Sequence, residues 1–406
     1  MKLVNGKLKV YIAMLVILLC FAASGCKLSP EFERILAGGR LSAGSITESV
    51  IPSQFENHMI YIKARINDSE REYNFLVDTG AFITVVNKRI ADSMGLKKAA
   101  EDIVADAAGN SRNIDGVVLK SLKIGDIEVQ NCGALAADFG NIESFGIKFD
   151  GVIGTNFLRF FIVDIDYEKE TLTFSTEQSF FNRLNAAEVS GLGRGSAFTY
   201  VNHDFRTKLK LADGNWVDAL IDTGNYGDFL TFPIKDLEQL KPHLNCPLVK
   251  SQGAITMSAF GGSNAMLSRI NEIQIAGNRI RNLPVAFVNS DHINISSGFL
   301  AHFKVIINYP KKKIFLIRNQ SKPFETNMSS FGFTPQYGAN GKLYIVGIWE
   351  GSPAEKNGLK VGDQIIRLTY QGPDRADLVI QNENGEKEIS LKVAPLLPAI
   401  DRDVTE

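Results

Sequence analysis

The sequence has few of the His and Cys residues that form metal centres, and it has no cluster of basic residues of the kind that binds nucleic acids. Only five of its 406 residues are His and four are Cys, and the His residues show no metal-ligand spacing. We therefore expect no metal and no cofactor. The 44 Lys and Arg residues are balanced by 45 Asp and Glu residues and form no basic stripe, so we expect no nucleic-acid partner. Cys132 and Cys246 are expected to be isolated buried thiols.

Long apolar runs are also scarce, except at the amino terminus. The stretch from Val10 to Ala23 follows three lysines and is too short to span a bilayer comfortably, so residues 1–25 are predicted to be a signal peptide. The segment ends in Ala23-Ser24-Gly25-Cys26, which resembles the lipobox of bacterial lipoproteins. This resemblance implies a lipid anchor on Cys26 at the bacterial cell envelope, with the outer membrane favoured because Lys27 follows. A secreted protein or an anchor helix is the alternative, and residues 26–50 are expected to be a tether.

Two Asp-Thr-Gly triplets are the most informative feature that the sequence does contain. Asp78-Thr79-Gly80 follows the apolar run Phe75-Leu76-Val77, and Asp222-Thr223-Gly224 follows Ala219-Leu220-Ile221. An apolar run is typical of a buried strand, which would carry the following carboxylate out of solvent. A buried carboxylate is unfavourable unless it is paired, hydrogen-bonded or protonated. Two of them in matching contexts indicate a pair of carboxyl groups that share a proton.

The flanks of the two triplets match as well. A predicted β-hairpin precedes each triplet, one around residues 59–77 and the other around residues 206–221. Further downstream, Val163-Asp164-Ile165-Asp166-Tyr167 is matched by Val305-Ile306-Ile307-Asn308-Tyr309. The chain therefore contains one structural unit twice.

With these residues in place, the sequence resembles the retropepsin-like aspartic proteases, in particular bacterial members with an Asp-Thr-Gly in each half. The resemblance implies a mainly β fold in which two pepsin/retropepsin-like β-barrel lobes span residues 51–180 and 195–318. Its implied catalytic residues are Asp78 and Asp222. The ionised carboxylate would act as general base on a water, and the protonated one would donate to the scissile carbonyl. In a single copy, such an Asp is as well explained as an ordinary turn residue.

The resemblance also implies supporting roles for the residues that follow each Asp. Thr79 and Thr223 would hydrogen-bond across the lobes, and Gly80 and Gly224 would let the backbone approach the carboxylates closely. Ala81 and Asn225 come next. Because Ala81 offers no hydroxyl to the dyad, we expect a dyad that works nearer neutral pH, although Asn225 has an amide that could donate.

The family places a second, apolar-apolar-Gly segment beneath each catalytic loop. Val152-Ile153-Gly154 fits this motif, and Ser296-Ser297-Gly298 is interpreted as its counterpart. Since serines would replace the apolar pair, the second lobe is expected to be the degenerate one.

A protease of this class also needs flaps that close over the substrate. The candidates are residues 105–111, with Gly109 and Asn110 at the tip, and residues 257–263, with Phe260, Gly261 and Gly262. Ordinary hairpin turns explain these two segments equally well.

After Ile317 the pattern changes, and residues 328–395 resemble a bacterial PDZ domain, a small α/β module. Its signature is the stretch from Gly351 to Ile366, and Phe331-Gly332-Phe333 is the implied loop for a peptide carboxylate. Residues 369–377 are too short, and too poor in helix formers, for the helix that normally lines the groove. Peptide capture and a packing or gating role therefore both stay open.

Taken together, the residues and the resemblance predict a lipid-anchored, monomeric aspartic endopeptidase that acts on polypeptides at the envelope. The main alternative is a non-catalytic peptide-binding lipoprotein with the same fold. A processing protease for a single envelope partner, or a homodimer that pairs only the first lobes, is also compatible with the sequence.

Overall fold

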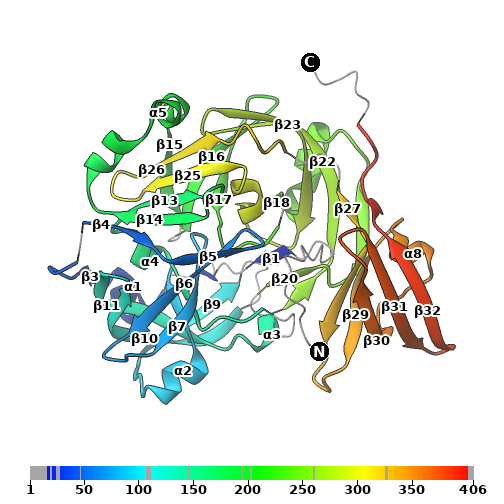
Figure 1. Ribbon diagram of the computed structural model, residues 1–406, viewed down its shortest axis with the longest axis horizontal. Helices are drawn as coiled ribbons and strands as arrows, with labels where there is room; N and C mark the ends of the chain where they lie inside the picture. Colours follow the sequence, from blue (N-terminus) through cyan, green and yellow to red (C-terminus); the bar gives the residue numbers. More distant parts are fainter. Residues whose placement is uncertain are drawn as a thin grey trace.

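A computed structural model describes residues 28–400 except 46, 107–110, 144–146, 194, 202–203, 228, 259–260 and 325–327, together with the backbone of residues 16–18 and 21–23. The chain is mainly β, as predicted (Figure 1). No helix within these described ranges is long and apolar enough to cross a membrane. Most of the predicted signal peptide and Cys26, the predicted lipidation site, lie outside the described residues.

The first β unit runs from residue 48 to residue 175 and begins with the predicted hairpin. Strands β6 and β7 pair antiparallel, with Tyr61 opposite Leu76, and β12 lies parallel to β7, with Ile153 beside Val77. Buried and less buried side chains alternate along much of β6, which is the pattern of a strand with one face in the core. The elements of this unit are β4 (Glu48–Ile51), β5 (Ser53–Glu56), β6 (Met59–Ile66), β7 (Glu72–Val77), β8 (Thr84–Asn87), α2 (Lys88–Ser93), β9 (Lys98–Asp106), β10 (Ser111–Ile124), β11 (Ile127–Ala137), α3 (Gly140–Glu143), β12 (Gly151–Ile153), α4 (Thr155–Leu158), β13 (Ile162–Asp166) and β14 (Thr171–Ser175).

The second β unit, residues 196–318, repeats these strand pairings. The hairpin of β16 and β17 takes the place of β6 and β7, and β24 lies parallel to β17 with Ile295 beside Ile221. The short connection between the units holds η1 (Gln178–Arg183) and α5 (Ala186–Leu192). The elements of the second unit are β15 (Ser196–Val201), β16 (Asp204–Leu211), β17 (Trp216–Ile221), β18 (Leu230–Pro233), η2 (Ile234–Asp236), α6 (Leu237–Leu240), η3 (Lys241–His243), β19 (Val249–Gly253), β20 (Thr256–Ser258), β21 (Gly262–Ser263), β22 (Ala265–Ile275), β23 (Asn278–Val288), β24 (Ile293–Ile295), α7 (Ser297–Leu300), β25 (Phe303–Asn308) and β26 (Lys313–Arg318).

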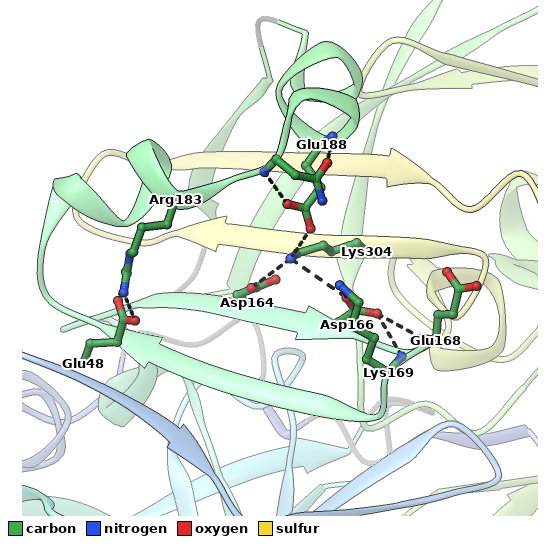
Figure 2. Close-up of polar contacts among 9 residues, drawn as sticks. Glu48, Asp164, Asp166, Glu168, Lys169, Arg183, Glu188 and Lys304 are labelled. Atoms are coloured by element: carbon green, nitrogen blue, oxygen red, sulfur yellow. Dashed lines mark hydrogen bonds and ion pairs between the residues drawn. The ribbon is translucent and has the colours of Figure 1, made fainter.

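A shared sheet joins the two units. Its strands run in the order β4, β14, β13, β25, β26, β15, so that three come from each unit, and the seam is the antiparallel pair β13–β25. Beside the seam, Lys304 of β25 is surrounded by three carboxylates, Asp164 and Asp166 from β13 and Glu188 from α5 (Figure 2). The sheet and this charge cluster hold the two units in a fixed relation.

The expected tether over residues 26–50 is wrong for its described part, because this segment packs against the first unit. Helix α1 (Pro30–Ala37) buries Phe32, Ile35 and Leu36, and it is followed by β3 (Arg40–Leu41), which pairs with β11. A Cβ on Gly133 would lie 2.2 Å from the carbonyl oxygen of Ile35, so the glycine makes room for the helix. The apolar stripe of α1 was visible in the sequence, but the groove that receives it is formed by distant strands.

The carboxy-terminal module, residues 328–397, continues the sheet of the second unit. Strand β29 pairs antiparallel with β19, with Ser251 opposite Trp349, and it also pairs with β28 and β30. Strand β31 pairs with β30 and β32 pairs with β31, and residues 369–377, which include the connection between β30 and β31, form no helix, which agrees with the short segment in the sequence. The elements are β27 (Ser329–Ser330), β28 (Phe333–Tyr337), β29 (Leu343–Trp349), α8 (Pro353–Lys356), β30 (Gln364–Tyr370), β31 (Arg375–Asn382), β32 (Gly385–Lys392) and β33 (Ala394–Pro395).

Two short strands lie within the predicted signal peptide. Strand β1 (Val16–Leu18) runs parallel to β20 of the second unit, and β2 (Phe21–Ala23) runs antiparallel to β9 of the first. Since β9 and β20 are arms of the two candidate flaps, each flap has one of these short strands paired with it.

Candidate active site

The two Asp-Thr-Gly triplets meet between the units. Asp78 follows β7 and Asp222 follows β17, and both side chains are fully buried. Each loop is fixed from below in the same way, because the N–H of Asp78 donates to the carbonyl of Ile153 and that of Asp222 to the carbonyl of Ile295, both at 3.0 Å. The two hairpins therefore deliver their carboxyl groups to equivalent places.

The two carboxyl groups are close enough to interact. A hydrogen bond links the side chains of Asp78 and Asp222, and backbone N–H groups of Gly80 and Ala81 donate to Oδ1 of Asp78 at 2.7 and 3.0 Å. Burial raises the pKa of Asp78 to about 6, although these hydrogen bonds act in the opposite direction. Asp78 is therefore a carboxyl group that can hold a proton in mildly acidic solution.

The threonines of the triplets bind each other's loop. Thr79 Oγ1 donates to the carbonyl of Ile221 at 2.7 Å, and Thr223 Oγ1 donates to the carbonyl of Val77 at 2.8 Å. Each hydroxyl also accepts the backbone N–H of the other threonine, at 3.0 and 3.1 Å. These are the contacts that the resemblance implies for Thr79 and Thr223, and they hold the two loops together.

Gly224 lies directly against the carboxyl group of the other unit. A Cβ at this position would come within 2.2 Å of Cγ of Asp78. The close backbone approach expected from the sequence is therefore required at Gly224, because any side chain would displace Asp78.

The segment beneath the second loop was assigned two residues too far along the chain. Because Ile295 is the residue paired with Ile221, the counterpart of Val152-Ile153-Gly154 is Asn294-Ile295-Ser296, and not Ser296-Ser297-Gly298. The helices that follow agree, since α4 begins at Thr155 and α7 at Ser297. The motif therefore keeps its second apolar residue, with Asn in place of the first and Ser in place of the Gly.

This register brings in a residue that the sequence reasoning missed. Asn294 is fully buried, and its Nδ2 donates to Oδ2 of Asp222 at 3.0 Å. The sequence had offered Asn225 as the amide donor, but both polar atoms of its buried side chain lack a hydrogen-bond partner among the described residues. The available signal was a polar residue between Ile293 and Ile295 in a buried strand.

The candidate flaps are only partly described. Gly109, Asn110 and Phe260 lie outside the described residues, whereas the arms β9 and β10 of the first flap and β20 and β21 of the second are present. In the second flap, Gly261 accepts hydrogen bonds from the N–H and the hydroxyl of Ser258, and Gly262 is paired with Met257. Met257 itself packs into the apolar cluster of the first unit, so this flap reaches across to the opposite side.

Neither metal nor nucleophilic cysteine chemistry has a candidate site in the part of the chain that the structure describes. No three His, Cys, Asp or Glu side chains gather there as metal ligands. Cys132 is buried, with its thiol pKa raised by burial to about 12, and Cys246 is partly buried; neither forms a disulfide. The titratable side chains of the two triplets are the buried carboxyl groups of Asp78 and Asp222.

Comparison with known proteins gives a family for part of the chain. Residues 62–157, which include Asp78 and β12, match the model of the family described as aspartyl protease. The chain contains an aspartyl protease domain. This domain, which includes the first Asp-Thr-Gly, implies a peptidase that hydrolyses polypeptides.

One solved structure similar to the chain is a retropepsin-like aspartic protease from Rickettsia conorii. Its identity is 21%, and the match covers 34% of this chain and 92% of the other, with a TM-score of 0.24. No curated protein matches.

Proposed function

We propose that the protein is an aspartic endopeptidase whose catalytic dyad consists of Asp78 and Asp222. The observation that carries the proposal is the meeting of two fully buried carboxyl groups, delivered by equivalent strands and joined by a hydrogen bond. Two carboxyl groups this close cannot both ionise readily, so they hold one proton between them. The proposal extends the aspartyl protease domain to a bilobal enzyme in which residues 195–318 form the second lobe.

In the proposed reaction, water is activated without a covalent intermediate. The ionised carboxylate takes a proton from the water, and the oxygen of the water forms a bond to the scissile carbonyl carbon. The π electron pair moves onto the carbonyl oxygen, which takes the proton of the other carboxyl group. In the collapse of the resulting gem-diol, the carboxylate that gave up its proton takes a proton from one hydroxyl as the C=O bond re-forms and the C–N bond breaks, and the carboxyl group that had taken the proton of the water gives it to the leaving nitrogen.

We further propose that the substrate binds as an extended strand between the flaps. The pairing of β2 with β9 and of β1 with β20 supports this, because it shows that both strand edges accept an extended backbone. An extended polypeptide offers the same backbone groups to both edges.

The alternative of a non-catalytic binding protein rests on the motif beneath the second loop, which departs from Val152-Ile153-Gly154 at Asn294 and at Ser296. That alternative was favoured by Ser296-Ser297 in the place of an apolar pair, whereas the observed register puts Asn294-Ile295 there. The triplets keep their Asp, Thr and Gly in both units.

For the carboxy-terminal module, we favour a packing or gating role over peptide capture. The N–H of Gly332, in the loop proposed for a peptide carboxylate, already donates to Ser330 Oγ at 2.9 Å, and Phe331 and Phe333 are buried. The lipobox-like Ala23-Ser24-Gly25-Cys26 supports a lipid anchor at the bacterial envelope, with the outer membrane again favoured.

The proposed function is tested by cleavage of a diverse peptide library between pH 4 and 8, using the chain from residue 27 onward. We expect Asp78→Asn and Asp222→Asn each to reduce cleavage by at least about 10³-fold, because each removes one of the two acid–base groups. Cleavage by the wild type should fall as the pH rises above about 6, because the dyad then loses the proton that it must donate.

The control is the free energy of unfolding of each variant, which separates loss of chemistry from loss of fold. Loss of cleavage in Asp78→Asn alone would indicate a homodimer that pairs first units. A folded wild type that binds library peptides and cleaves none at any pH would contradict the proposal.

A further inference from the structure

The carboxyl groups of Asp78 and Asp222 have different surroundings, although the loops that carry them are equivalent. Both oxygens of Asp222 accept hydrogen bonds from protein N–H groups, Oδ1 from the N–H of Gly224 and Oδ2 from Nδ2 of Asn294, each at 3.0 Å. Asp78 accepts from backbone groups, with the N–H groups of Gly80 and Ala81 on Oδ1 and a further contact from the backbone of Gly224, and no side-chain amide among the described residues donates to its Oδ2. The asymmetry is therefore a side-chain amide donor that Asp222 has and Asp78 lacks.

This difference follows from one position in the strand beneath each loop. Asn294 lies beside Leu220 in the β17–β24 pair, and Val152 lies beside Leu76 in the β7–β12 pair. The two residues are therefore equivalent by register, but only the asparagine has a side-chain donor. Ala81, after the first triplet, has none either. No side chain at these two positions can donate to Asp78.

Hydrogen bonds donated to a carboxylate stabilise its ionised form. The amide nitrogen of Asn294 can only donate, so it favours a charged oxygen at Oδ2 of Asp222 and disfavours a proton there. We propose that Asn294 favours the ionised form of Asp222 and thereby places the proton of the dyad on Asp78. If the proposed function is correct, on which this step rests, Asp222 is the general base for the water and Asp78 the acid that protonates the carbonyl oxygen. Asn294 is a positioning residue that acts through Asp222.

The test replaces Asn294 with the residue that the first unit has at this position. In Asn294→Val the protonation of the two carboxyl groups is followed by ¹³C NMR of the whole protein labelled at the aspartate carboxyl carbon. Asp78→Asn and Asp222→Asn spectra assign the two signals. In the wild type we expect the Asp78 signal to titrate and that of Asp222 to stay at its ionised position between pH 4 and 8. In Asn294→Val the Asp222 signal should begin to titrate, with its midpoint raised by about one unit, a tenfold change in proton affinity.

The reciprocal variant Val152→Asn adds a donor beside Asp78 and should lower the midpoint of the Asp78 signal. If Asn294→Val does not fold, Val152→Asn alone tests whether a donor at this position sets the protonation of the neighbouring carboxyl group. An Asp222 signal that titrates in the wild type, or that is unchanged in folded Asn294→Val, would overturn the inference, as would an unchanged Asp78 midpoint in Val152→Asn.

The pH dependence of activity gives a second readout. It would not change if Asn294 had only a structural role. In the pH profile of kcat/KM for a peptide selected from the library, the acid limb reports ionisation of the base, and in Asn294→Val it should move about one unit toward higher pH. Because the NMR titration needs no turnover, an inactive wild type with the expected carboxyl signals would refute the protease and leave the proton placement standing. An active wild type whose acid limb does not move in Asn294→Val would support the protease and refute the proton placement.

Discussion

At the scale of single residues, the threonines of the triplets form the hydrogen bonds that join the loops of the two units. Each hydroxyl donates to one backbone group of the opposite loop and accepts from another. Thr79 and Thr223 are fully buried, so no water is at hand to replace a lost partner. The position of the two carboxyl groups therefore depends on two hydroxyls.

We expect Thr79→Val, which keeps the shape of the side chain, to lower the free energy of unfolding by about 2–4 kcal/mol. The reason is that the carbonyl of Ile221 and the N–H of Thr223 both lose their partner in the interior. Denaturant unfolding measures the loss. Thr79→Ser keeps the hydroxyl and is the matched control, which should recover most of the stability; equal losses in both variants would contradict the argument.

At the scale of elements, the carboxy-terminal module is fixed to the strand that leads into the second flap. Strand β19 pairs with β29, and after two intervening residues the chain enters β20, an arm of the flap. Trp349 of β29 and Ile255 beside the flap belong to one buried apolar cluster, which also contains Leu220 of β17. The module is therefore in contact with the strand that leads into the flap and with the strand that carries Asp222, and we expect a movement of the module to reach both.

Gly347 is the point where this contact is closest. A Cβ there would lie 2.4 Å from the backbone oxygen of Ala254. We expect Gly347→Ala to separate β29 from β19 and to lower the free energy of unfolding by about 1–3 kcal/mol. It should also increase proton exchange at the amide of Ala254, which donates to the carbonyl of Val346 at 2.7 Å.

Hydrogen exchange with mass spectrometry of the peptide covering β19 and β20 measures this opening. Gly44→Ala is the control, because a Cβ at Gly44 would meet no atom within 4 Å. Unchanged exchange in Gly347→Ala would show that the flap does not depend on the module.

The elements also show which parts of the fold could be predicted from the sequence and which could not. The hairpins, the repeated unit and the meeting of the triplets could be predicted, because apolar runs and turn residues are local signals. The register of β24 could not, because it is set by pairing with β17, and a polar residue at Asn294 hides the apolar pattern. The packing of α1 and the pairing of β19 with β29 depend on surfaces that exist only after distant strands have come together.

At the scale of the whole molecule, the units are joined by a sheet whose seam carries a concentrated charge cluster. Lys304 lies 2.7 Å from Glu188 and 3.3 Å from Asp164, with Asp166 at 3.9 Å, so one cation faces three carboxylates (Figure 2). Lys169 binds Asp166 from the outer side. Oδ1 of Asp164 is buried without a partner among the described residues. Of the three carboxylates, Asp164 is the one whose charge the cluster satisfies least.

Burial raises the pKa of Asp164 to about 6, against the opposing effect of Lys304, so its ionisation is disfavoured in the folded protein. A carboxyl group with a raised folded pKa contributes stability below its unfolded pKa of 3.8 and loses that contribution as the pH rises through about 6. We therefore expect Asp164→Asn, which never ionises, to gain stability relative to the wild type between pH 4 and 7, by about 1–3 kcal/mol. Denaturant unfolding of both proteins at several pH values measures the difference.

Asp92→Asn, at an exposed ion pair on α2, is the control and should show only a small difference over the same range. A difference for Asp164→Asn that is constant from pH 4 to 7 would show that the seam between the units tolerates the ionised carboxylate.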